Sequence, residues 1–382
     1  MKGRKFLHTI AQLKAELGQT VLEREEMIQG MLLGLLTGQH VLFIGPPGTA
    51  KSMLVNEFGS RLDGGRFFTY LMTKFTKPDE IIGAVSLKGL EKDEYVRVLD
   101  GKIADAHFVF LDEIFNSNSS CANAILTILN ERKLHNGTEV VDVPLIMMVG
   151  ATNELPHEVA DELQAFYDRF LFRYEVNYLN DVENLRRLFD FATSGERGIH
   201  YSVDALRGWQ QQVEGIEVSA EIVNRVISIV LKLREAGITI SDRRFKNSRR
   251  VLQAQAFLNG RAQVELEDLK VLRDIFWLKP QDKKVFGGIL YTVKLTVEVQ
   301  ASELLKEAMQ IKRKFETLED KARMQVLGGE LNKRLTEIEN RLSELKAVAG
   351  VPSAVLADAA QKAEEIHANI IRECLGSGAS LV

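Results

Sequence analysis

The chain has 382 residues, 45% hydrophobic and 27% charged, a composition that indicates a globular protein of more than one domain and excludes a mainly disordered one. Its formal net charge of −4, from 49 basic and 53 acidic residues, provides no basic field for phosphate backbones, which disfavours nucleic acid as a partner. Cys121 and Cys374 indicate no disulfide framework, and no apolar stretch has the length of a secretory signal or a membrane span, so we expect a cytoplasmic protein without membrane insertion.

A helix leads into a predicted parallel sheet. Apolar residues recur at helical spacing over 23–36, and Gly38 follows where glycine commonly ends a helix. Five short runs then have the near-continuous hydrophobicity of strands buried on both faces. These runs are His40–Ile44, Phe67–Leu71, Phe108–Leu111, Leu145–Val149 and Phe170–Val176. The segments between them leave room for crossover helices, so the sequence predicts a doubly wound α/β domain with a five-stranded parallel sheet.

A β-hairpin and a helical domain are also predicted. Residues 133–141 indicate a projecting hairpin, in which Asn136 and Gly137 supply the two positive φ angles of a type I′ turn. From about Tyr201 the strand pattern ends and helical spacing returns. Three helices are expected there, from Ser219 to Gly237, from Ser241 to Leu258 and from Leu266 to Leu278. They predict an all-helical domain that ends before Pro280.

The region after residue 280 has the heptad spacing of a coiled coil. Its interruptions are expected at Gly328, Gly329, Gly350 and Pro352, with an alanine-rich helix running on to Cys374. Residues 289–299 alternate like a strand, but a helix is favoured because they also extend the longer helical seam. We therefore expect a coiled-coil-like arm, as a helical hairpin or three helices. The predicted domains are residues 1–200 with the sheet, 201–280 with the helices, and 281–382 with the arm.

A phosphate-binding loop is predicted directly after the first strand. The sequence GPPGTAKS fits the P-loop pattern except that Ala50 stands where a second glycine is usual. Its residues are Gly45, Pro46, Pro47, Gly48, Thr49, Ala50, Lys51 and Ser52. Lys51 would contact the β and γ phosphates of ATP and Ser52 would bind Mg²⁺, while Ala50 would be tolerated with a negative φ. The alternative is a glycine-proline turn before a helix.

Two further strand ends carry polar residues toward the same sheet edge. Asp112 and Glu113 follow the third strand, where Asp112 would hold Mg²⁺ and Glu113 would orient and deprotonate the attacking water. Asn153 follows the fourth strand and could contact the γ phosphate. The alternatives are a solvated strand end for the acids and an ordinary turn for Asn153.

These strings resemble the MoxR family of the AAA+ superfamily, and within it the RavA-type branch. The resemblance covers residues 17–279 and includes GPPGTAKS, FLDEIFN, ATNELP, YDRF and SDRRFK. It implies that Asn153 is sensor 1, that Arg169 is an arginine finger reaching the ATP site of a neighbouring subunit, and that Arg243 is sensor 2, bringing the lid onto the nucleotide. Arg132 is the rival finger and Arg244 the rival sensor. Arg169 could instead form an ion pair with Asp168.

The resemblance also implies an assembly and a task. We expect a homo-oligomer, a hexameric ring, that hydrolyses ATP with Mg²⁺ to remodel or mature a protein client, with a von Willebrand factor A domain adaptor as a further partner. The insertion over 83–103 and the hairpin would face the central pore, where Lys133 and His135 could contact the client. The alternatives are a nucleic-acid motor of the same clade and a nucleotide-gated scaffold with little turnover. After residue 280 the chain departs from the RavA type.

Overall fold

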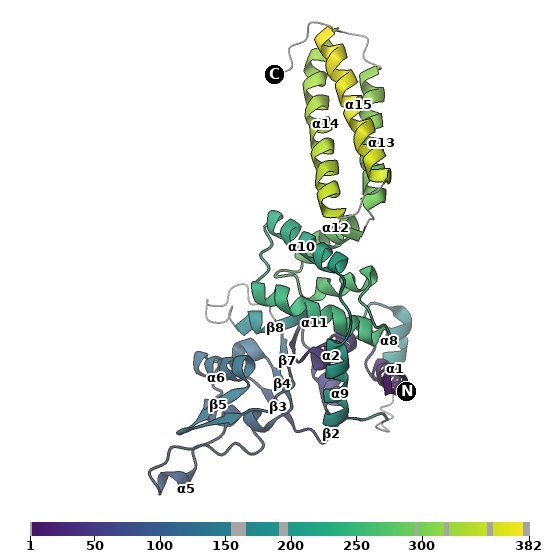
Figure 1. The fold of residues 1–382 in the computed structure, drawn as a ribbon. Coiled ribbons are helices and arrows are strands. Elements are labelled where there is room, and N and C mark those ends of the chain that lie inside the picture. The colour runs from purple at the N-terminus through teal and green to yellow at the C-terminus, as the bar shows by residue number, and fades with distance from the viewer. Residues whose placement is uncertain are drawn as a thin grey trace. The chain divides into compact units, whose positions relative to one another are not determined.

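The structure, a computed structural model, describes residues 2–153, 166–190, 198–294, 297–316, 321–349 and 354–376 (Figure 1). It separates into two compact units. The first consists of Met1–Val223 and Arg234–Lys283, and the second of Asn224–Leu233 and Lys284–Val382.

A five-stranded, all-parallel sheet organises the first unit, with strand order β3-β4-β7-β1-β8. Its strands are β1 (His40–Ile44), β3 (Phe67–Leu71), β4 (Phe108–Asp112), β7 (Met147–Thr152) and β8 (Phe170–Glu175). All residues of β1 are buried, as expected for a central strand covered on both faces. The sequence located these strands closely. The largest difference is β7, which begins two residues after the expected Leu145 and extends to Thr152.

Helices cover both faces of this sheet. On one face lie α2 (Glu25–Thr37) and α3 (Lys51–Gly59). Helix α2 packs so closely on the sheet that a Cβ on its Gly34 would overlap the side chains of Val41 and Met147. Helix α3 contacts β4 through Phe58, whose ring lies 6.0 Å from that of Phe108. Side chains alternate along a strand, so the next residues face the other way. There Leu42 and Val109 join a buried cluster with residues of α4 (Pro78–Ile82) and α6 (Ser119–Glu131). The result is a three-layer α/β domain.

The remaining elements of the first unit flank this domain. They are α1 (Lys2–Thr20), α5 (Leu87–Leu90), η1 (Ile103–Asp105), η2 (Ile114–Asn116), α8 (Val182–Phe189), α9 (Val203–Glu214), α11 (Asp242–Leu258), η4 (Leu266–Asp274), and the paired strands β2 (Leu62–Asp63) and β9 (Tyr201–Ser202). Helix α10 (Ala220–Glu235) contributes residues to both units. Ser219 and Ser241 cap their helices as expected. One expectation was wrong, because η4 is a 3₁₀ helix that ends at Asp274, and α9 was not among the helices predicted individually.

The projecting hairpin is present, with a different turn. Strands β5 (Lys133–Asn136) and β6 (Glu139–Asp142) pair so that Asn136 lies opposite Glu139, which leaves Gly137 and Thr138 at the turn. Gly137 has a φ of 66°, whereas Asn136 belongs to the strand. One positive φ at the first turn position is typical of type II′, so the type I′ prediction was wrong.

The insertion over 83–103 lies against this hairpin (Figure 1). A β-bridge joins Val85 and Arg97 within the insertion. The Asn136 side chain accepts a hydrogen bond from Arg97 N at 2.6 Å and donates one to Arg97 O at 3.2 Å. A single amide therefore joins two loops that are far apart in sequence, in the manner of a strand partner.

The second unit contains α12 (Asp282–Lys294), α13 (Val297–Glu316), α14 (Lys321–Ala349) and α15 (Ala354–Gly376). Helices α13, α14 and α15 lie side by side and share one buried cluster, which includes Ile311, Leu335 and Ile366 (Figure 1). The preference for helix over 289–299 is confirmed where the structure describes it. The interruption at Gly328 and Gly329 was wrong, because α14 continues through both. The interruptions at Gly350 and Pro352 lie outside the described residues.

Candidate functional site

The predicted phosphate loop connects β1 to α3 and is tightly built. A Cβ on Gly45 would lie 1.9 Å from the carbonyl oxygen of Val176, so only glycine fits there. Gly48 has a φ of 76°. Lys51 Nζ is directed into the loop and donates to the carbonyl oxygens of Gly45 and Pro46, at 2.7 and 2.8 Å. Burial lowers the pKa of Lys51, while Asp112 and Glu113 act to raise it. The ammonium lies at the start of α3, which has no side-chain cap, and the positive end of a helix favours an anion.

Ala50 does not have the conformation expected from the sequence. Its φ is 61°, in the left-handed region, where the expectation was a negative angle. This conformation costs a residue with a Cβ about 1–2 kcal/mol. Backbone strain of this kind gathers at functional sites, where the surrounding structure holds it in place.

Ser52 and Asp112, the two residues predicted to bind Mg²⁺, contact each other. Ser52 Oγ, on the first turn of α3, donates to Asp112 Oδ2 at the end of β4 across 2.7 Å. A hydroxyl and a carboxylate are the oxygen ligands that Mg²⁺ prefers, and a site with few protein ligands leaves places for water and phosphate oxygens. The residues present therefore fit the ion that the sequence predicted.

Glu113 and Asn153 meet beside this pair. Glu113 has a φ of 52°, and its carboxylate accepts hydrogen bonds from the side chains of Asn153 and Asn116, the latter at 3.1 Å. Asn153 Oδ1 lies 3.3 Å from Lys51 Nζ. Burial, followed by the charge of Asp112, raises the pKa of Glu113. A carboxylate with a raised pKa, fixed by two amides, has the properties of a general base.

Arg24 supports the loop and was missed in the sequence. Its guanidinium is buried and donates to the carbonyl oxygens of Thr49, Asn177 and Glu23, at 3.2, 2.8 and 2.7 Å. It therefore ties the phosphate loop to the segment that follows β8. In the sequence Arg24 lies among the acidic residues Glu23, Glu25 and Glu26, a pattern typical of a solvated surface, so nothing indicated this role.

Arginines lie at the other edge of the sheet, where the strands begin. Arg132 donates to Gly38 O at 3.1 Å and contacts His40 Nε2 at 2.9 Å, at the start of β1. Arg243 Nη2 donates to Asn130 Oδ1 at 3.2 Å, two residues before Arg132. Lys51, by contrast, follows the end of β1. This placement opposes a contact between Arg243 and a phosphate held by its own chain.

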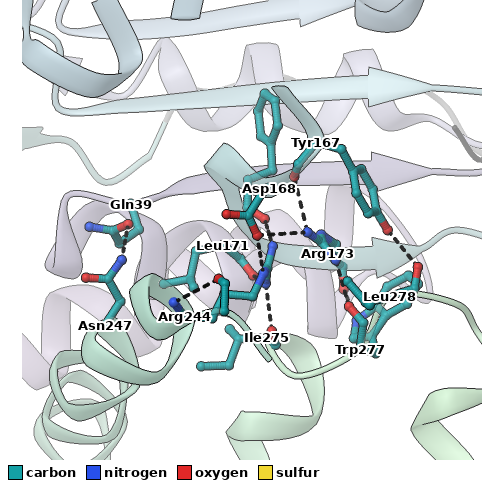
Figure 2. A network of polar contacts seen from close by, with 12 residues as sticks. Gln39, Tyr167, Asp168, Leu171, Arg173, Arg244, Asn247, Ile275, Trp277 and Leu278 are labelled. Atoms are coloured by element: carbon teal, nitrogen blue, oxygen red, sulfur yellow. Dashed lines mark hydrogen bonds and ion pairs between the residues drawn. The ribbon is translucent and has the colours of Figure 1, made fainter. Parts of the chain in front are cut away.

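Arg169 lies in the YDRF segment at the start of β8, also at this second edge (Figure 2 shows its neighbours). Asp168 is paired with Arg244, with Oδ1 3.0 Å from Arg244 Nε, and the structure records no ion pair between Asp168 and Arg169 among the described residues. Arg169 Nε is buried and has no hydrogen-bond partner among those residues. Arg244, in contrast, is buried and hydrogen-bonded to three backbone carbonyls as well as to Asp168.

The five polar residues predicted for phosphate and metal chemistry therefore gather at one edge. They are Lys51, Ser52, Asp112, Glu113 and Asn153. Within the described ranges, none of them is hydrogen-bonded to an arginine. Residues 154–156, the end of the ATNELP string, lie outside those ranges.

Comparisons with known proteins agree with this geometry. Residues 8–201 match the MoxR domain of the MoxR-vWA-beta-propeller ternary systems, and residues 221–290 match an AAA lid domain. The chain belongs to the MoxR family of AAA+ ATPases. The predicted fold class, an α/β AAA+ core with a five-stranded parallel sheet and a helical lid, is confirmed. The narrower resemblance to the RavA-type branch stays a prediction.

Several relatives of this MoxR-family chain cover much of its length. Two uncharacterized proteins of Methanocaldococcus jannaschii are 39% identical over 289 residues, 75% of each chain, and 40% identical over 274 residues, 72% of each chain. The chaperone MoxR1 of Mycobacterium tuberculosis is 32% identical over 180 residues, 46% of each chain. The crystal structure of a proposed ATPase from Cytophaga hutchinsonii superposes with a TM-score of 0.63 at 23% sequence identity. The superposition covers 77% of this chain and 96% of the Cytophaga chain. That likeness shows the fold alone.

In the ranges that the structure describes, no helix has the length and apolarity needed to cross a bilayer. In the same ranges, no group of three or more histidine, cysteine or acidic side chains is arranged to hold a metal ion.

Proposed function

We propose that this chain is a Mg²⁺-dependent ATPase. The gathering of Lys51, Ser52, Asp112, Glu113 and Asn153 at one sheet edge supports this proposal. Bound Mg²⁺ would neutralise charge on the phosphates during hydrolysis. Ser52 and Asp112 would hold the ion and Lys51 would contact the β and γ phosphates, while Glu113 would accept the proton of the attacking water that Asn153 positions.

The proposed active site is completed by a second copy of the chain. No arginine among the described residues is hydrogen-bonded to the polar cluster, whereas Arg169 and Arg243 lie at the opposite edge. Head-to-tail contact between two copies would bring the strand-start edge of one copy to the strand-end edge of the next, and repetition of that contact closes a ring. Arg169 then stabilises the transferred phosphoryl group of the neighbour, and Arg243 contacts the same neighbour. We expect a hexamer.

The task of the ring follows from its family. MoxR domains of this type are named for ternary systems with vWA partners, and one relative is a chaperone. We therefore keep a von Willebrand factor A domain adaptor as partner, the remodelling of a protein client as function, and the cytoplasm as location. The nucleic-acid motor is less well supported, because the net charge of −4 provides no attraction for a phosphate backbone.

Purified protein tests this proposal directly. ATP hydrolysis should require Mg²⁺ and should be lost in a Lys51→Met variant, while light scattering should show a ring-sized species with ATP. Stimulation by DNA with a steep salt dependence would favour the motor instead. Nucleotide binding without turnover in the unaltered protein would favour a scaffold.

A further inference from the structure

A buried network surrounds the YDRF segment on both sides of Arg169 (Figure 2). Asp168, immediately before Arg169, accepts a hydrogen bond from Arg244 Nε at 3.0 Å. The carbonyl oxygen of Phe170, immediately after it, accepts a second hydrogen bond from Arg244, through Nη2 at 2.6 Å. One guanidinium thus holds both neighbours of Arg169, and the planar fork of arginine is suited to such a double contact.

Arg244 is itself fixed by the lid. It lies near the start of α11, is 1% exposed, and its Nη1 donates to the carbonyl oxygens of Leu171 and Ile275 at 2.8 and 2.6 Å. Burial lowers the pKa of Arg244, and the charge of Asp168 opposes that effect. A buried guanidinium with every branch bonded has little freedom to move, so it is a rigid support rather than a mobile phosphate sensor.

Arg173 and Tyr167 complete the network. Arg173, with no exposed side-chain surface, donates to Trp277 O at 2.7 Å and to Tyr167 O at 3.2 Å, and its guanidinium stacks 3.7 Å from the Tyr167 ring. The Tyr167 hydroxyl donates to Leu278 O at 3.1 Å. The segment that carries Arg169 is therefore joined to the residues after η4 as well as to α11 (Figure 2).

Arg169 is less well bonded than the other two arginines of this network: Arg244 and Arg173 donate to carbonyl oxygens, although Arg173 also has a buried Nε without a partner among the described residues. The neighbours of Arg169 on both sides are bonded, but its own buried Nε has no partner among the described residues. Because Nε is buried, a phosphate outside the chain cannot reach that atom. Arg169 as a whole is only partly buried, so the phosphates of a neighbouring chain would contact its Nη atoms.

We propose that Arg244, acting through Asp168 and the Phe170 carbonyl, is a positioning residue that holds Arg169 toward the phosphates bound by a neighbouring chain. The inference rests on the proposed function. It predicts that damage to the Asp168–Arg244 pair harms the active site of the neighbour and leaves the site of the same chain intact.

Mixing two variants separates these effects. Glu113→Gln chains lack the base but keep Arg169, so they can complete the site of a chain whose own arginine is absent or misplaced. Arg169→Ala alone should be nearly inactive, and an equal mixture with Glu113→Gln should recover roughly a quarter of the unaltered rate, because about a quarter of the contacts then join an intact base to an intact arginine. A Lys51→Met and Glu113→Gln mixture should recover nothing.

The test variant is Asp168→Asn, which removes the charge at a side chain that is 33% exposed and leaves the carbonyl contacts of Arg244 in place. Alone, it should lower kcat by about 10²-fold with KM changed less than about twofold, because a catalytic group displaced by about 1 Å loses that much. Mixed with Glu113→Gln, it should recover activity as Arg169→Ala does. Arg244→Lys, which keeps the charge but loses the fork, should behave in the same way.

Asp268→Asn provides a matched control. Asp268 is buried and forms an ion pair with Arg261, beyond the far end of α11. Because α11 has 17 residues, this pair lies about 20 Å along the helix from Arg244. The variant should lower the melting temperature at least as much as Asp168→Asn does, yet keep kcat within about threefold of the unaltered protein.

The outcomes separate the two claims. If Arg169→Ala is not rescued by Glu113→Gln, the arginine does not act between chains, and both the proposed assembly and this inference fall. If Arg169→Ala is rescued but Asp168→Asn and Arg244→Lys are not, the network serves the chain's own site or its folding, and the positioning role is refuted while the proposed function stands. Full activity of Asp168→Asn alone would refute it as well.

Discussion

The two edges of the sheet differ in how their charged groups are used. At the edge where strands end, Lys51, Ser52, Asp112, Glu113 and Asn153 contact one another through their side chains, in the cluster that we propose binds phosphate and a metal. At the edge where strands begin, Arg132 and Arg244 are occupied by backbone carbonyls of their own chain. Arg169 and Arg243, at the same edge, are not bonded to backbone carbonyls in this way: Arg243 donates to the Asn130 side chain, and the buried Nε of Arg169 has no partner among the described residues. The comparison teaches that charge alone does not indicate a catalytic role: the contacts already made by each side chain decide it.

The strongest test of this comparison is Arg169→Ala. We expect kcat to fall by about 10³-fold, the lower end of what an arginine finger contributes, with nucleotide affinity nearly unchanged. Steady-state hydrolysis and fluorescent-nucleotide binding measure the two quantities. The exposed Arg207, 65% exposed, supplies the control, since Arg207→Ala should leave both unchanged. A similar loss in both variants would contradict the distinction between the two edges.

At the opposite edge, Glu113→Gln should lower kcat by about 10²-fold, because general-base catalysis contributes at least that factor. ATP binding should persist, since Lys51, Ser52 and Asp112 remain. Single-turnover hydrolysis and equilibrium binding distinguish the two effects. Turnover close to that of the unaltered protein would show that Glu113 is not the base.

His40 gives a smaller effect, on stability. It lies buried beside Arg132, and burial together with that charge lowers the pKa of His40 well below 6.5. The folded protein keeps His40 neutral while the unfolded chain binds a proton near pH 6.5, so this histidine makes the free energy of unfolding fall as the pH drops below that value. The loss should be about 1 kcal/mol for each pH unit.

Denaturant unfolding from pH 7.5 to pH 5 measures the effect of His40. A His40→Asn variant is the reference, because the difference between the two proteins isolates this residue from other titrating groups. The advantage of the unaltered protein should shrink as the pH falls. A constant difference would show that His40 is not kept neutral.

Ala50→Gly should have the smallest effect. Glycine removes a left-handed strain of about 1–2 kcal/mol at φ 61° but loses about 0.5–1 kcal/mol of backbone entropy, so a net stabilisation of about 0.5 kcal/mol is expected. Thermal unfolding measures it, and ATPase activity should remain. A destabilisation would mean that the Ala50 methyl group makes contacts that outweigh the strain.

Sequence patterns were sufficient where local chemistry decides the structure. Buried parallel strands leave continuous apolar runs, so β1 and β3 were located to the residue. The contact between the loop after β1 and the acids at the end of β4 could be predicted because a phosphate-binding motif has a spacing that its ligand sets rather than distant packing. The φ angle of Ala50 was predicted wrongly, since it depends on how the loop closes over Lys51.

Long-range packing explains what the sequence could not provide. Arg243 and Arg244 are adjacent, and which of them is buried depends on how α11 docks against β8. Arg24 is hidden among acidic neighbours, although its partners lie in two distant segments. Helix α14 continues through two glycines, and residues that follow them, such as Leu331 and Leu335, pack into the buried cluster, a gain that exceeds the cost of about 1 kcal/mol for each glycine.

The Asn136 amide has a mechanical consequence. It is bonded to both backbone groups of Arg97, whose guanidinium in turn contacts Asp79 of α4 and the Gly83 carbonyl. A pull on the tip of the hairpin is therefore shared with the insertion and reaches the helix beneath it, so the two loops yield together. Substitution of this one asparagine would uncouple them, and each would then bend under load independently of the other.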